Sequence, residues 1–153
     1  MTIGGEKTSV SKNVENSIKS KIKEVSRIGG ENRYETAYKV ADEVRRLTNN
    51  NKDLILVDGT DFPDGITISS LAAKFKSPIL LTVPNRLHPV TEEAVSRWKI
   101  ENILIGGGYN SVSKKIEDQM NIKNKERVAG SNRYDTAVEI SIRYTENKKL
   151  GSK

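Results

Sequence analysis

The chain of 153 residues contains no cysteine and a single histidine, His88. The absence of cysteine excludes disulfide bonds, thiolate metal sites and cysteine nucleophiles. A zinc site needs several histidine or cysteine ligands, which His88 cannot supply alone. We therefore assign His88 no role and expect neither a metal nor a cofactor.

Long apolar runs are also missing. No stretch approaches the roughly 20 consecutive apolar residues that a membrane span requires, so we expect no membrane partner. The start, Met1–Glu6, has neither a basic leader nor an apolar core segment, which predicts no secretory signal peptide in this stretch. Aromatic residues make up 5% of the chain and form no aromatic-rich platform of the kind that binds nucleic acid.

Charge is plentiful and unbalanced. The net charge of +6 and the pI near 9.5 favour polyanionic partners such as phosphate-bearing glycopolymers, nucleic acid or anionic membrane surfaces. Lysines 19, 21 and 23 alternate with other residues in a helical stretch, and a solvated helix face explains them equally well. Nonspecific binding of nucleic acid would depend on charge alone and fall steeply with salt, so we predict no nucleic-acid partner.

The sequence repeats itself. Residues 27–37, RIGGENRYETA, return at 127–137 as RVAGSNRYDTA, and the pattern from Ile3-Gly4-Gly5 to Lys12 returns from Ile105 to Lys114. Such self-similarity indicates a modular array. We predict a complete repeat at residues 27–126, the tail of a preceding copy at 1–26, and the start of a following copy at 127–153.

Short apolar runs alternate with amphipathic stretches. Residues 54–57, 78–83 and 103–105 are typical of strands buried on both faces of a parallel sheet. Apolar residues at helical spacing predict helices over about 10–25, 36–44, 66–75 and 91–98. This order predicts an α/β fold, a Rossmann-like three-layer module with an open, mainly parallel sheet and helices on both faces.

Each partial copy has an apolar face that it cannot bury alone. It must pack on the complete copy in the same chain or be exchanged with a neighbouring chain. Both alternatives predict close contacts between modules.

Arg33 and Tyr34, with their copies Arg133 and Tyr134, are candidate ligand residues. A guanidinium can bind phosphate or carboxylate through two parallel hydrogen bonds, and a phenol ring offers an apolar face to a sugar. In the structural alternative, Asn32 caps the following helix, Arg33 pairs with an aspartate of the segment 61–64, and Tyr34 packs in a module interface. Retention of the pair in both copies fits either interpretation.

The segment Gly59–Asp64 follows a strand and precedes a helix, so it lies at the carboxyl edge of the sheet, where open α/β proteins bind ligands. Asp61 could cap the helix that Pro63 is suited to start. Asp58, Asp61 and Asp64 could also gather a divalent cation, although no supporting motif accompanies them.

The turn at residues 106–111, GGGYNS, also joins a strand to a helix. It could bind phosphate through its backbone amides, but it lacks the endings of the Walker and dinucleotide motifs, so a tight turn is the favoured interpretation. Trp98, near a helix end, could stack on sugar or pack in the core. The run 79–81, Ile-Leu-Leu, reads as a buried strand.

Several separated motifs share one fixed order: RIGG with NRYETA at 27–37, GTDFPD at 59–64, PILLT at 78–82, and IGG with VS at 105–113. Together they resemble the clostridial cell-wall-binding repeat that occurs in tandem in surface-layer proteins, autolysins and phage lysins. The resemblance covers residues 27–144 and extends into 1–26. The family's Phe-Pro-Asp-Ala-Leu stands here as FPDGI.

The resemblance implies a nonenzymatic anchor at the extracellular cell wall that recognises an anionic secondary wall polysaccharide. It also implies a Toprim-like or Rossmann-like module, usually in three copies about a pseudo-threefold axis. Because this chain has one complete copy, we expect a homo-oligomer, with a trimer favoured. We predict a ligand site in a groove where modules meet. It is formed by the motif residues Arg33, Tyr34, Asp61, Phe62, Asp64, Arg133 and Tyr134.

Two other functions remain open. A structural assembly module would form oligomers without binding sugar. A metal-dependent phosphoryl-transfer domain would use Asp58, Asp61 and Asp64 to bind a divalent ion.

Overall fold

The computed structural model describes residues 1–146 and 150–151. Its six helices and six strands alternate along the described chain, in the order β1 Thr2–Gly4, α1 Lys12–Lys19, β2 Ser26–Ile28, α2 Arg33–Thr48, β3 Asp53–Asp58, α3 Pro63–Phe75, β4 Ile79–Thr82, α4 Pro89–Arg97, β5 Asn102–Gly106, α5 Lys114–Gln119, β6 Asn124–Val128 and α6 Arg133–Thr145. None of the helices in the described part is long and apolar enough to cross a membrane.

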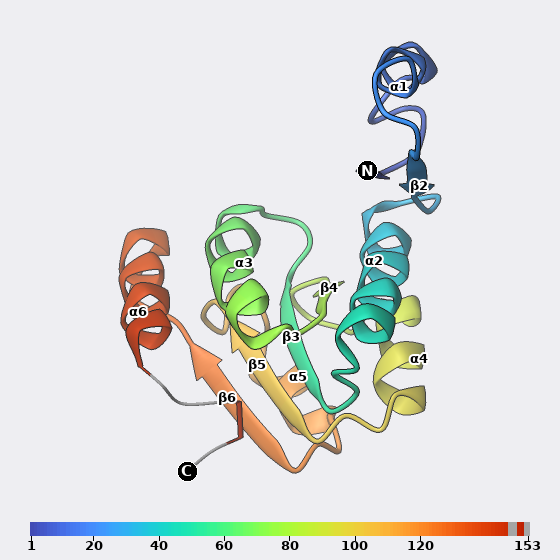
Figure 1. The fold of residues 1–153 in the computed structure, drawn as a ribbon. Coiled ribbons are helices and arrows are strands. Elements are labelled where there is room, and N and C mark those ends of the chain that lie inside the picture. The colour runs from blue at the N-terminus through green and yellow to red at the C-terminus, as the bar shows by residue number, and fades with distance from the viewer. Residues whose placement is uncertain (147–149, 152–153) are drawn as a thin grey trace.

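The main sheet has four parallel strands in the order β4-β3-β5-β6 (Figure 1). Strand β3 shows why the sheet is covered on both sides. Its Leu54 and Leu56 belong to one buried cluster, and Ile55 and Val57 belong to the other. Side chains alternate across a strand, so an unbroken apolar run needs a layer of helices on each face.

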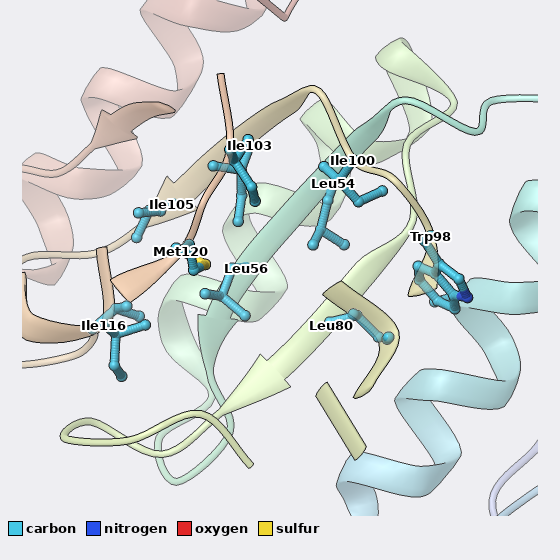
Figure 2. Close-up of a cluster of buried hydrophobic side chains, with 13 residues drawn as sticks. Leu54, Leu56, Leu80, Trp98, Ile100, Ile103, Ile105, Ile116 and Met120 are labelled. Carbon is cyan, nitrogen blue, oxygen red and sulfur yellow. The ribbon is translucent and has the colours of Figure 1, made fainter. Parts of the chain in front are cut away.

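The first cluster contains residues of α2, α4 and α5, and the second contains residues of α3 and α6. Figure 2 shows part of the first cluster, in which Ile116 and Met120 lie near Leu56, and Trp98 lies at the opposite end near Leu80. The predicted α/β three-layer architecture with a parallel sheet is confirmed.

A small N-terminal lobe made of β1, α1 and β2 stands apart from this sheet (Figure 1). Strands β1 and β2 form their own two-stranded parallel sheet, and the lobe joins the rest of the chain through α2. Its apolar side chains are poorly covered. Val14 is 48% exposed, whereas Ile116, at the equivalent place in α5, is fully buried.

The repeated sequence adopts the same local structure twice. Arg27 donates hydrogen bonds to the carbonyls of Gly5 and Val10 and to the carboxylate of Glu15. Arg127 makes the equivalent bonds to Gly107, Val112 and Glu117. The N-terminal lobe therefore has the local fold of β5-α5-β6.

Several local predictions need correction. The helix expected over about 10–25 extends only from Lys12 to Lys19, and β1, β2 and β6 were not expected, because these strands carry few apolar residues. Trp98 is 8% exposed; it stacks on Tyr38, and the guanidinium of Arg45 lies over its ring, so it packs in the core and presents no face to sugar. Helix α6, in the segment predicted to start a following copy, packs against α3 of the same chain.

Candidate functional site

A polar pocket of about 440 Å³ lies at the carboxyl ends of β3, β5 and β6. The chain leaves each of these parallel strands at the same edge of the sheet, which brings three strand-to-helix turns together. The pocket is lined by residues of those turns and of the helices that follow them: Asp58, Asp61, Pro63, Asp64, Gly108, Tyr109, Asn110, Ser111, Gly130, Ser131, Asn132, Arg133 and Thr136.

One side of the pocket is acidic. Asp58 is buried, and its carboxylate accepts hydrogen bonds from the backbone N–H (2.7 Å) and the hydroxyl of Thr60, which fixes the turn after β3. Asp64 accepts a hydrogen bond from the hydroxyl of Ser111 at 3.2 Å. Asp61 is mostly exposed and accepts one from the N–H of Phe62. Asp61 and Asp64 thus present carboxylate oxygens toward the pocket, while Asp58 serves the turn.

The expectation that Asp61 caps α3 is wrong. The N-cap position is Phe62, and no side chain makes a capping hydrogen bond there. Pro63 still starts the helix as predicted, because its fixed φ suits the first turn and its missing N–H needs no partner.

The opposite side of the pocket is the N-terminus of α6. Asn132 caps this helix by accepting hydrogen bonds from the N–H groups of Tyr134 (2.8 Å) and Asp135 (2.9 Å). Arg133, the first residue of the helix, is largely exposed, and its guanidinium lies 3.8 Å from Asp61. The helix dipole and this guanidinium both favour an anion.

The turn after β5 forms the third wall. Gly107 has φ +94°, and a Cβ there would overlap the Asp64 carboxylate and lie 2.9 Å from Cβ of Ser111, so the turn requires glycine. Arg127 holds this turn from behind through its hydrogen bond to the Gly107 carbonyl at 2.6 Å. The same guanidinium lies 4.4 Å from the ring centre of Tyr109, a residue that is 55% exposed and lines the pocket.

Arg33 and Tyr34 lie outside this pocket, on the far side of the turn after β3. Arg33 donates a hydrogen bond to the carbonyl of Gly59 at 2.7 Å, where the structural alternative expected an aspartate. Tyr34 stacks on His88 with ring centres 4.0 Å apart and packs so closely on Gly59 that a Cβ there would lie 2.7 Å from the ring. Both residues support the turn from behind.

Of the seven predicted site residues, the structure brings Asp61, Asp64 and Arg133 together in the pocket. Phe62 and Tyr134 are 72% and 76% exposed and follow pocket residues in the sequence. Tyr109, Asn110, Ser111 and Ser131 also line the pocket, and the sequence analysis did not select them. The signal that could have found them is the position of all three turns at one edge of a parallel sheet.

Within the described residues, no group of three or more histidine, aspartate or glutamate side chains is arranged to hold a metal ion. The carboxylate of Asp58 is engaged by Thr60, and that of Asp61 accepts a hydrogen bond from the N–H of Phe62 and lies 3.8 Å from the guanidinium of Arg133. The alternative of a metal-dependent phosphoryl-transfer site therefore has no ligand set in this part of the chain.

Comparison with known proteins agrees with this fold. The family model for cell wall binding domain 2 (CWB2) matches residues 27–117. Two curated relatives come from Bacillus subtilis (strain 168). N-acetylmuramoyl-L-alanine amidase LytC is 32% identical over 120 residues, which are 76% of this chain and 23% of LytC. The amidase enhancer is 33% identical over 127 residues, which are 82% of this chain and 17% of that protein.

Two solved structures from Clostridium difficile have the same fold. Cwp6 superposes with a TM-score of 0.85 at 29% sequence identity, covering 94% of this chain and 23% of Cwp6. Cwp8 gives a TM-score of 0.74 at 33% identity, covering 91% of this chain and 23% of Cwp8. The chain thus spans less than a quarter of the length of each of these proteins. With the family model matching more than half of its residues, the chain belongs to the cell wall binding domain 2 family.

Proposed function

We propose that the chain is a nonenzymatic module that binds an anionic secondary polysaccharide of the Gram-positive cell wall and so holds a larger protein at the cell surface. Membership of the CWB2 family supports binding to the wall. The single observation that supports a glycopolymer ligand is the polar pocket, which combines carboxylate acceptors with a guanidinium at a helix N-terminus.

The pocket offers two kinds of contact that an anionic sugar needs. Asp61 and Asp64 can accept hydrogen bonds from sugar hydroxyls. Arg133, which stands at the positive end of the α6 dipole, can bind a phosphate or carboxylate of the polymer. Phe62 and Tyr134 supply exposed apolar faces near the pocket against which a pyranose ring can pack. Arg33 and Tyr34 act indirectly, by holding the turn that carries Asp61.

The net charge of +6 supports the anionic nature of the ligand at longer range, since a basic surface raises the local concentration of a polyanion. The pocket itself is not uniformly basic. Hydroxyl recognition by the aspartates and anion recognition by Arg133 would select a polymer that carries both groups.

The experiment is sedimentation of the purified protein with isolated clostridial walls, before and after mild acid extraction of phosphate-linked polymers, across a salt series. Specific anchoring predicts retention that disappears on extraction and survives about 0.15 M salt, where exposed charges are screened beyond about 8 Å. If the protein still sediments with extracted walls and is released by modest salt, the proposal is contradicted.

Arg133→Lys tests the guanidinium. This change keeps the charge but removes the bidentate hydrogen bonding of a guanidinium, so we expect the affinity for the wall to fall roughly tenfold or more. Arg97→Lys is the matched control, because Arg97 lies on α4, is exposed and pairs with Glu93 outside the pocket. If both variants bind the wall as well as the original chain, Arg133 does not contact the polymer.

Within the chain, residues 27–126 are taken as the complete repeat, with 1–26 and 127–153 as partial copies; residues 147–149 and 152–153 of the last segment lie outside the described residues. The matching hydrogen bonds of Arg27 and Arg127 support this division.

A homo-oligomer, in its simplest form a trimer, is the proposed assembly, because helices α2 and α6 leave apolar side chains exposed. Light scattering should give three times the chain mass of 17.0 kDa, and a monomer would contradict it.

A structural assembly module without glycan binding is the second candidate, and the same exposed apolar side chains favour it. It predicts oligomers that fail to sediment with walls. The two readouts together therefore separate anchoring from assembly.

A further inference from the structure

The lining of the polar pocket contains two classes of residue. Much of it lies in the repeated sequence, so these positions have equivalents in the earlier copy. The residue is the same in both copies at Ser111, Gly130, Asn132, Arg133 and Thr136. It differs at Gly108, Tyr109, Asn110 and Ser131, where the earlier copy has Glu6, Lys7, Thr8 and Glu31.

Several of the shared residues make the same structural contacts in both copies. Asn132 caps α6 in the way that Asn32 caps α2, by accepting hydrogen bonds from two N–H groups of the first turn. The hydroxyl of Thr136 accepts a hydrogen bond from the N–H of Gly130 at 3.0 Å, and the equivalent bond in the earlier copy measures 2.9 Å. These residues therefore build the turns of the pocket.

The differing positions tolerate change within the same turn. Gly107 and its equivalent Gly5 have φ +94° and +93°, a conformation that requires glycine. The next residue, Gly108, has no such restriction, because a Cβ there would meet nothing within 4 Å, and the earlier copy places Glu6 at this position. The turn is thus a constant support for residues that can be exchanged.

In this pocket the differing positions are occupied by uncharged residues. Tyr109, Asn110 and Ser131 are exposed and line the pocket. A phenol ring can pack against a pyranose, and the amide and hydroxyl side chains can form hydrogen bonds with sugar hydroxyls. The equivalent positions of the earlier copy carry two carboxylates and an ammonium, which suit a different ligand.

The ring of Tyr109 is fixed on one side. The guanidinium of Arg127 lies over it at 4.4 Å and is itself bonded to the carbonyl of Gly107 and the carboxylate of Glu117. Because Tyr109 is still 55% exposed, its other face remains open. A ring that is already held loses little conformational entropy when a ligand packs on it. Arg27 makes the same hydrogen bonds in the earlier copy, where Lys7 offers no ring.

We infer that residues 108–110 and 131 select which sugar the pocket accepts, with Tyr109 as the platform for an uncharged sugar ring. The inference rests on the proposed wall-binding function and names the selective part of its site. Arg133 and the aspartates bind anionic groups and hydroxyls, which many wall polymers share. The differing positions add the contact with one particular ring.

Tyr109→Ala tests the platform by sedimentation with isolated clostridial walls. Loss of the ring should lower the affinity for the walls roughly tenfold, whereas Tyr109→Phe should bind within about twofold of the original chain. Tyr144→Ala is the matched control. Tyr144 is 48% exposed, also has a cation over its ring, and stands at the other end of α6 from Arg133, so its loss should leave retention unchanged. Equal retention of the Tyr109→Ala variant and the original chain, or an equal loss in Tyr109→Phe, overturns the platform.

Exchange of all four positions tests selection. The variant Gly108→Glu, Tyr109→Lys, Asn110→Thr and Ser131→Glu gives the pocket the residues of the earlier copy. Its urea midpoint should stay within about 0.5 M, because the residues that build the turns are kept, while its affinity for the walls should fall roughly a hundredfold.

The two proposals can fail separately. If the original chain is retained and Arg133→Lys weakens retention, but the four-position variant binds the walls like the original chain, selection by these positions is wrong and wall binding stands. If the original chain itself is not retained by the walls, both proposals are overturned.

Discussion

Replacing Gly107 by alanine should destabilise the chain by about 2–6 kcal/mol. At φ +94° an L-residue is strained, which costs roughly 1–3 kcal/mol. The new Cβ would also overlap the Asp64 carboxylate and lie 2.9 Å from Cβ of Ser111, and such overpacking costs a further 1–3 kcal/mol or so. The turn cannot relax freely, because Arg127 holds the Gly107 carbonyl at 2.6 Å.

Urea denaturation followed by circular dichroism measures this cost. With an m value of about 2 kcal/mol/M for a domain of this size, the midpoint should fall by about 1–3 M. Gly108→Ala is the control one residue further on, since its φ is not positive and its Cβ would meet nothing within 4 Å; its midpoint should stay within about 0.5 M. Equal midpoints for the two variants would refute the argument that the pocket turn depends on glycine at 107.

Two further predictions concern the repeated elements. Ile140→Ala should lower the free energy of unfolding by about 2–4 kcal/mol, because Ile140 is 1% exposed. Val40→Ala at the equivalent position of α2, where Val40 is 39% exposed, should lower it by less than about 1 kcal/mol. Urea denaturation at low protein concentration measures both values, and equal losses would contradict the different burial of these two positions. Hydrogen bonds from Lys19 and then Arg27 lower the pKa of Glu15 from 4.5 to about 2, so its stabilisation of the N-terminal lobe is complete above pH 4.5 and is lost as the pH falls toward 2. The protection of the α1 amides, measured relative to their intrinsic exchange rates, should therefore fall over that range, and Glu15→Gln should abolish this fall. If this variant loses protection over the same pH range as the original chain, the assignment to Glu15 is wrong.

The central elements could be predicted because each has its own local signal. Strand β3 is an unbroken apolar run, and a parallel strand buried on both faces needs such a run. Strands β2 and β6, with sequences SRI and NKERV, carry polar residues whose pairing depends on partners elsewhere in the chain. Their position could not be read from periodicity.

The pocket was predictable only in part, for a similar reason. Asp61, Asp64 and Arg133 stand in turns that a parallel sheet brings to one edge, so their meeting follows from fold class. The position of Arg33 does not, because its bond to the Gly59 carbonyl depends on how α2 packs against the turn after β3. Arg33 and Arg133 therefore occupy equivalent positions in the repeated sequence but make different contacts.

The polar pocket crosses the boundary of the sequence repeat. Asp58, Asp64 and Ser111 precede the point at 127 where the repeated motif begins again, while Asn132 and Arg133 follow it. In a tandem array, each pocket is consequently completed by the first helix of the next repeat, so n full repeats contain only n − 1 closed pockets unless an extra helix follows the last one. Here α6 completes the pocket of the segment 27–126, and the valency of any array, with the avidity that depends on it, is set by the number of such junctions.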